Sequence, residues 1–246
     1  MDFGIIFIIL AGGLLPPLLW LWFWLKEDSE NPEPRRLIIL TFLAGMLVVA
    51  LALPLEKLIQ YILEEAGLLL IGDGFVLLFF WAFAEEISKY IAARKTALKN
   101  KECDEPIDPI IYMITAALGF AALENIIFLD GIIGDYGITT GLLTGNLRFA
   151  GANLIHIISS ATVGASISFC FFHKSKYKRN VFWGLMLATL LHTFFNYFII
   201  KTDGKNLIQV FFPLWLLAIV LVLIFSKVKK IKNKKNIEPV KPNDKY

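Results

Sequence analysis

The sequence predicts an all-α membrane protein, a polytopic transmembrane helical bundle with about seven spans. Of its 246 residues, 57% are hydrophobic and 18% are charged, and the mean hydropathy is +0.66. These values are typical of polytopic membrane proteins rather than of soluble domains. Each apolar segment is close to the roughly 20 residues that a helix needs to cross the hydrocarbon core. The expected spans are residues 3–25, 37–55, 74–93, 109–129, 147–172, 181–200 and 207–225.

Local signals place the ends of several spans. Pro16 and Pro17 predict a kinked or broken first helix, because proline removes a backbone donor and clashes with the preceding turn. The alternating prolines of residues 31–34 stop both flanking helices and hold the connector extended. Residues 55–67 have helical apolar spacing, which fits either an amphipathic helix at the outer interface or an extension of the second span. Asp108, followed by proline, is a good N-cap, so the fourth span is expected to begin there.

The basic residues predict the orientation of the bundle. Most of the 24 lysines and arginines follow the first, third, fifth and last spans, and few lie in the alternate loops. The positive-inside rule then places the N-terminus outside and the C-terminus in the cytoplasm, in a cell (plasma) membrane. Residues 227–246 form a basic disordered cytoplasmic tail, and residues 1–226 a single transmembrane domain. Lysines at the membrane edge account for the net charge of +3, so no nucleic-acid partner is expected.

The most informative residues are three charged side chains near the middle of the third span. Glu85 and Glu86 are adjacent, and Lys89 follows one turn later, so its ammonium can reach either carboxylate. A charged side chain at mid-bilayer costs roughly 2.5 to 3.5 kcal/mol unless a neighbour compensates. The group therefore indicates a functional site that other helices complete.

Three further spans carry polar residues that a purely structural membrane helix would avoid. These residues are Glu124 and Asn125 in the fourth span, Arg148 and His156 in the fifth, and His192 and Asn196 in the sixth. Counted from the outer end of each span at about 1.5 Å per residue, Glu85, Glu124, these two histidines and Asn196 lie roughly 8 to 16 Å deep. One pocket in the outer half of the membrane is therefore predicted to hold them.

Such a pocket has the ingredients for hydrolysis. A carboxylate can act as a general base, imidazoles can transfer protons or bind a metal, and an amide or a cation can hold an oxyanion. Hydrolysis of a peptide bond is the favoured reaction. Two other classes explain the same residues: a proton- or cation-coupled transporter with Glu85 and Glu124 as ion sites, and a non-catalytic scaffold that binds a partner helix. A transporter predicts inverted repeats, and the two halves of the chain show no convincing similarity.

The order of these residues resembles the PrsW family of intramembrane proteases, which are relatives of the CAAX-processing membrane proteases. The resemblance covers roughly residues 16–200. It rests on residues 31–34, Glu85-Glu86-x-x-Lys89, residues 104–108 before Tyr112, residues 119–125, Arg148 with His156, and His192-x-x-x-Asn196.

The resemblance implies an intramembrane endopeptidase whose substrate is a single-span membrane protein. Such enzymes are thought to make the first cut in an anti-sigma factor, on the extracytoplasmic side. Glu85 and Glu86 would be the acidic catalytic pair, and His156 and His192 the essential histidines. Glu124 stands where CAAX-type relatives have a histidine. The supporting or oxyanion-holding residues would be Lys89, Glu124, Asn125, Arg148 and Asn196.

Two mechanisms fit this set. In the first, Glu85 or Glu86 deprotonates water directly, a histidine shuttles the proton, and His192 with Asn196 stabilises the oxyanion. In the second, two histidines and one glutamate bind zinc, and another glutamate is the base. The possible zinc ligands are Glu85, Glu86, Glu124, His156 and His192. The sequence lacks an HExxH motif, which favours the metal-free mechanism.

Overall fold

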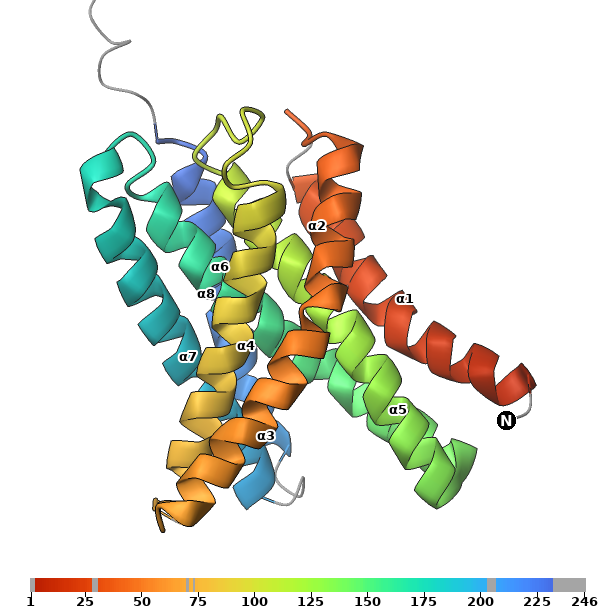
Figure 1. Ribbon diagram of the computed structural model, residues 1–246. Helices are drawn as coiled ribbons and strands as arrows, with labels where there is room; N and C mark the ends of the chain where they lie inside the picture. The colour runs from red at the N-terminus through yellow and green to blue at the C-terminus, as the bar shows by residue number, and fades with distance from the viewer. Residues whose placement is uncertain (1–2, 28–30, 70, 73, 203–206, 232–246) are drawn as a thin grey trace, which may run out of the picture.

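The computed structural model describes residues 3–27, 31–69, 71–72, 74–202 and 207–231 (Figure 1). Every regular element in these ranges is a helix, which confirms the all-α class. The elements are α1 (Phe3–Glu27), α2 (Arg35–Leu47), α3 (Val49–Glu65), α4 (Phe75–Thr96), α5 (Asp108–Ala150), α6 (Ala152–Ser168), the short 3-10 helix η1 (Lys174–Lys176), α7 (Tyr177–Lys201) and α8 (Leu207–Val228).

Among the described residues, five helical stretches are long and apolar enough to cross a membrane. They are Phe3–Glu27, Arg35–Glu65, Asp108–Leu143, Tyr177–Lys201 and Val210–Val228. Helix α6 is apolar but has 17 residues, and α4 carries the charged residues of the third predicted span. The protein is therefore a multi-pass membrane protein. The total of seven spans and the orientation of the termini stay predictions.

The first two predicted spans differ from the structure in detail. Helix α1 continues through Pro16 and Pro17, so the broken form of this helix is wrong. Neighbouring helices can satisfy backbone groups that proline leaves unpaired, which is why membrane helices tolerate it. Helices α2 and α3 follow one another across a single residue, Val48, and continue to Glu65. Most of residues 55–67 therefore extend the second span.

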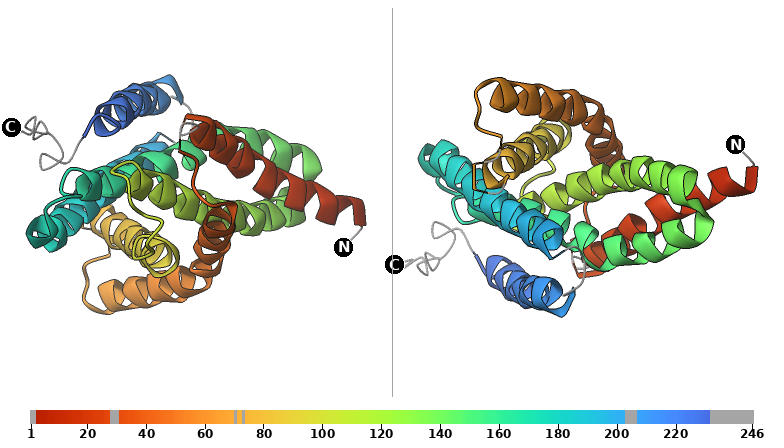
Figure 2. Two further views of the ribbon diagram at one scale, coloured as in Figure 1. Left: turned by 90° about the horizontal axis from the view of Figure 1, so that it is seen from above. Right: turned by 90° about the horizontal axis from the view of Figure 1, so that it is seen from below.

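The residues between the fourth and fifth predicted spans, 130–146, are helical and belong to α5. Helix α5 reverses direction at Gly137, whose φ of 83° and ψ of 170° lie outside helical values. Glycine adopts positive φ without steric cost, so the chain can turn back with hardly any loop. Figures 1 and 2 show the two arms of α5 side by side. The second arm leads almost directly into α6.

Helix α5 is the centre of the bundle. It packs against α1, α2, α4 and α6, and its residues 110–114 are almost completely buried. Helices α6 and α7 pack on each other, and α7 also packs on α4 (Figure 2). The four helices that carry the predicted site residues, α4 to α7, therefore meet in the interior.

A crossing between α2 and α5 is close enough to require glycine. A Cβ atom on Gly45 would overlap the carbonyl oxygen of Ala116, and a Cβ atom on Gly119 would overlap the carbonyl oxygen of Phe42. Small residues at such crossings let membrane helices pack backbone to backbone. Gly119 precedes Glu124 on α5 by five residues, so the crossing lies close to the turn that carries that carboxylate.

The predicted cytoplasmic loops gather at one end of the bundle, the upper end in Figure 1. Polar contacts join them there: Asn31 donates to Glu105 over 2.7 Å, and the Tyr112 hydroxyl donates to Glu33. The connector of residues 31–34 is thereby held against the start of α5. Residues 232–246, most of the predicted basic tail, lie outside the described residues.

Candidate active site

The charged residues of α4 are buried together, as the sequence predicted. The ammonium nitrogen of Lys89 lies 2.8 Å from Oε1 of Glu86 and 3.1 Å from Oε2 of Glu85. Lys89 and Glu86 are 0% exposed, and Glu85 is 9% exposed. Helical spacing alone brings the three side chains together, because residues three and four positions apart share one face.

Glu86 is enclosed by donors from three helices. Its Oε1 lies 2.9 Å from the Ser159 hydroxyl and 3.0 Å from Nδ1 of His192, in addition to Lys89. Its Oε2 accepts a hydrogen bond of 2.9 Å from the Ser160 hydroxyl. A carboxylate held in this way is fixed in position and has little room for a water molecule. Glu86 is therefore suited to orienting its neighbours.

His156 lies between Lys89 of α4 and Glu124 of α5. Its Nδ1 is 2.7 Å from the Lys89 ammonium, and its Nε2 is 2.8 Å from Oε2 of Glu124. An ammonium group can only donate, so Nδ1 must be the acceptor and Nε2 must carry the proton that Glu124 accepts. The contacts of this histidine thus assign its tautomer.

His192 has the opposite tautomer. Its Nδ1 lies 3.0 Å from Oε1 of Glu86, a carboxylate that accepts, so Nδ1 carries a proton, and in the neutral ring Nε2 then keeps its lone pair. The ring nitrogens that carry no proton in these tautomers, Nδ1 of His156 and Nε2 of His192, lie 3.7 and 3.9 Å from Oε2 of Glu85, and Nδ1 of His156 also accepts the hydrogen bond from Lys89. The ring centroids are 5.0 Å apart.

Glu85, His156 and His192 form a group that could hold a metal ion. One ligand atom from each lies within 4.8 Å of the other two, and all three residues are buried. A glutamate and two imidazoles are a common donor set for catalytic zinc. The second nitrogen of each imidazole meets a carboxylate, Glu86 or Glu124, which is the usual way in which metal-binding histidines are oriented.

The remaining predicted site residues lie at different distances from this cluster. Asn125 donates to Asn153 over 2.9 Å, which joins α5 to α6 next to the cluster. Asn196 lies one turn after His192 and is half-buried, and within the described part of the chain it forms no hydrogen bond to the cluster. The side chain of Arg148 lies outside the described residues.

Sequence reasoning missed two serines and one glutamate. Ser159 and Ser160 follow His156 by three and four residues, so their helical spacing from the histidine is the signal that could have found them. Glu56 on α3 interacts electrostatically with Glu85 and Glu124. No local pattern separates Glu56 from the other charged residues of its segment.

Glu124 is the most exposed residue of the polar cluster. The Glu124 side chain is 30% exposed and that of Glu85 is 12% exposed, whereas both histidine side chains are at most 3% exposed.

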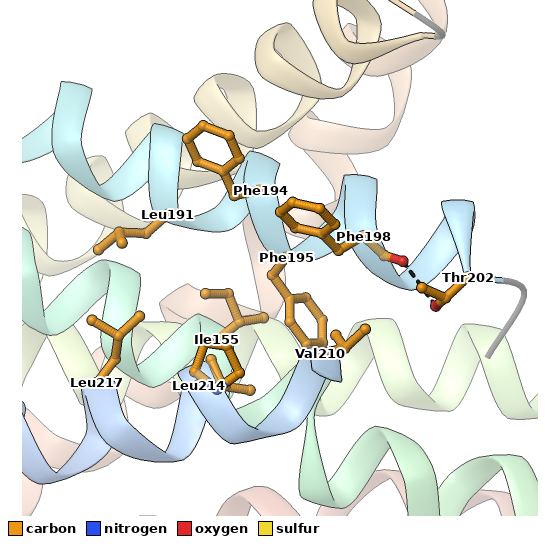
Figure 3. A pocket seen from close by; sticks show the side chains of 10 residues that line it. Ile155, Leu191, Phe194, Phe195, Phe198, Thr202, Val210, Leu214 and Leu217 are labelled. Carbon is orange, nitrogen blue, oxygen red and sulfur yellow. Dashed lines mark hydrogen bonds between the residues drawn. The ribbon is translucent and has the colours of Figure 1, made fainter. Parts of the chain in front are cut away.

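An apolar cavity of about 310 Å³ lies between α6, α7 and α8 (Figure 3). Its wall includes Ile155 and Leu191, the residues just before the two histidines, but none of the polar cluster. The cavity is therefore separate from the polar site.

We expect Ser160→Ala to slow peptide cleavage by up to about tenfold, because it removes one of the hydrogen bonds that fix Glu86, and Glu86 in turn orients His192. The change removes the hydroxyl that contacts Oε2 of Glu86 and should cost about 1 to 3 kcal/mol of stability. Cleavage rate and thermal unfolding of the purified variant measure the two effects. Ser168→Ala is the matched control, because that buried serine of α6 donates only to the Gly164 carbonyl. Equal losses in both variants would contradict the role given to Ser160.

Buried carboxylates and imidazoles on the inner faces of apolar helices are the groups that a membrane-embedded hydrolase needs. Comparison with known sequences identifies the family: the sequence model of the PrsW family intramembrane metalloproteases matches residues 33–225, and the chain belongs to this family. The protein is therefore a peptidase. This result confirms the family resemblance, and the description of the family names its members metalloproteases.

Several relatives match over most of their length. Protease PrsW of Bacillus subtilis (strain 168) is 30% identical over 213 residues, which cover 84% of this chain and 88% of the relative. Protease PrsW of Geobacillus kaustophilus (strain HTA426) is 26% identical, with 96% of this chain and 97% of the relative covered. Protease PrsW of Clostridioides difficile (strain 630) is 28% identical, with 86% and 84% covered. No solved structure matches the chain.

Proposed function

We propose that this protein is a zinc-dependent endopeptidase that cuts a single-span membrane protein near the extracytoplasmic side of the plasma membrane. Glu85, His156 and His192 are the zinc ligands in this proposal. The observation that carries it is the convergence of one nitrogen from each histidine, Nδ1 of His156 at 3.7 Å and Nε2 of His192 at 3.9 Å, on Oε2 of Glu85. The description of the family as metalloproteases also supports it.

The donor set fits zinc in chemistry as well as in position. Zinc prefers imidazole nitrogen and carboxylate oxygen, and a catalytic site keeps at least one position for water or substrate. The three residues come from α4, α6 and α7, whose packing fixes the separation of the donors. The HExxH motif is unnecessary here, because its function is to place two histidines on one helix, and this fold supplies them from two.

In this proposal the residues around the metal ligands have separate roles. Glu85, His156 and His192 would hold the zinc ion, which would supply Lewis acidity for activating water and polarising the peptide carbonyl. Glu86 holds His192 through Nδ1, and Glu124 holds His156 through Nε2. Of these two carboxylates, Glu124 has the more accessible side chain, and we assign it the acceptance of the proton from water.

The substrate class is an anti-sigma factor with one membrane span. The support for this proposal is the family relation together with the predicted depth of the cluster, in the outer half of the membrane. A site at this depth reaches a peptide bond close to the outer end of a substrate helix, where the helix frays most easily.

We expect a zinc chelator to abolish cleavage by the purified enzyme in detergent, and added zinc to restore it. The reason is that the proposed site, Glu85, His156 and His192, activates water only with zinc bound. The assay uses single-span membrane proteins as substrates, and mass spectrometry maps the cut. A serine-protease inhibitor serves as the control treatment and should have no effect. Cleavage that continues in metal-free enzyme would instead support direct activation of water by a glutamate. If a broad substrate panel stays uncut, the non-catalytic scaffold becomes the better explanation.

A further inference from the structure

We propose that Lys89 competes with the metal ion for the same ligand atoms, so that it weakens metal binding while holding the empty donor set in place. This inference rests on the metal site of the proposed function. It assigns to the lysine of Glu85-Glu86-x-x-Lys89 a role in setting metal affinity, in addition to its ion pairs on α4.

The Lys89 ammonium is completely enclosed. Its side chain is 0% exposed, and its three N–H groups meet three acceptors: Glu86, Glu85 and His156, at 2.8, 3.1 and 2.7 Å. The nitrogen also lies 4.5 Å from the centre of the Phe120 ring, within the range of a cation–π contact. These contacts hold the Lys89 ammonium in one position inside the cluster.

Two of these three acceptors are proposed metal ligands, namely Oε2 of Glu85 and Nδ1 of His156. A carboxylate oxygen has two lone pairs, but a neutral imidazole has only one bare nitrogen with one lone pair. Nδ1 of His156 can therefore accept a hydrogen bond from Lys89 or bind a metal ion, but not both. Metal binding must break the 2.7 Å contact between these two residues.

Lys89 and a metal ion also compete electrostatically, because each neutralises the same carboxylates and repels the other cation. Glu85, Glu86 and Glu124 bring three carboxylates to the cluster, and Lys89 supplies a buried positive charge that offsets their repulsion. A divalent ion beside the same carboxylates would also offset their repulsion, and the Lys89 ammonium would repel that ion. Lys89 keeps its contact with Oε1 of Glu86 when it releases His156, so the ammonium remains paired in either case.

The test is to measure zinc affinity and thermal unfolding of Lys89→Met in the full-length protein in detergent. Competition with a chromophoric chelator gives the affinity, and unfolding is followed with and without zinc. Because the variant removes a neighbouring positive charge and frees His156, we expect zinc to bind at least about tenfold more tightly. We also expect a lower unfolding temperature without zinc, which zinc restores. A structural role alone would lower the stability without tightening zinc binding.

Two variants control this experiment. Lys95→Met removes an exposed lysine of the same helix and should change neither quantity. Lys89→Arg keeps the charge and should bind zinc about as tightly as wild type does. If Lys89→Met folds only in the presence of zinc, the rate at which a chelator extracts the ion replaces the affinity, and extraction should be slower than from wild type.

The outcomes separate this inference from the proposed function. Wild type that binds no zinc would overturn the metal site itself and this inference with it. Stoichiometric zinc in wild type, with equal or weaker binding in Lys89→Met, would leave the metal site intact and overturn only the competition.

Discussion

Glu85→Gln is expected to abolish cleavage and zinc binding while the protein stays folded. The amide has nearly the shape of the carboxylate but no charge, so the site loses its anionic ligand. Lys89 retains its ion pair with Glu86 at 2.8 Å, and the α4 segment keeps one buried charge pair. We expect the cleavage rate to fall by at least about a thousandfold, within the range found for groups that act directly in hydrolysis. Cleavage of a membrane-protein substrate and the zinc content of the purified variant measure the effect.

Two comparisons make this result specific. Glu102→Gln changes an exposed glutamate that pairs with Lys101 in the loop before α5, and it should leave activity and zinc content unchanged. Glu86→Gln removes an enclosed carboxylate outside the ligand set, so it should retain measurable zinc. If Glu85→Gln keeps its zinc and Glu86→Gln loses it, the two adjacent carboxylates have the reverse of the proposed roles.

Gly119→Leu is expected to prevent α2 and α5 from packing. A side chain at this position meets the backbone carbonyl of Phe42, which cannot turn away as a flexible side chain can. Overpacking of a core usually costs about 1 to 3 kcal/mol, and overlap with a backbone atom puts this change at or above the top of that range. The unfolding temperature in detergent, together with size-exclusion behaviour, measures the loss.

Gly134→Leu is the matched control for this variant. It makes the same substitution in the same helix, at a position where a Cβ atom meets nothing within 4 Å. Both changes increase the hydrophobicity of α5 equally, so a difference between them reports packing rather than membrane insertion. Equal stability of the two variants would mean that the α2–α5 crossing can open without cost.

Short-range rules predicted much of the candidate site. The contacts of Lys89 with Glu85 and Glu86 follow from spacing within one helix. The meeting of Glu124, His156 and His192 follows from equal depth in antiparallel spans, since a bilayer fixes where each helix begins and ends. These two arguments need no knowledge of which helix packs on which.

The remaining features depend on that packing. The tautomers of His156 and His192 are set by partners on other helices, and so is the enclosure of Glu86 by Ser159 and Ser160. The reversal of α5 at Gly137 could not be predicted because residues 130–146 hold four other glycines, and no local pattern separates Gly137 from them. The roles of Glu85 and Glu86 could be separated only by their surroundings.

The placement of His192 on α7 has a consequence for the biosynthesis of the enzyme. Helices are delivered to the membrane in chain order, and α7 is followed by only one further helix among the described residues. A nascent chain that has inserted α1 to α6 carries Glu85 and His156 but lacks the third proposed ligand. With His192 as a ligand, the proposed site is complete only after α7 has been inserted, so proteolytic activity is expected to begin no earlier than that step.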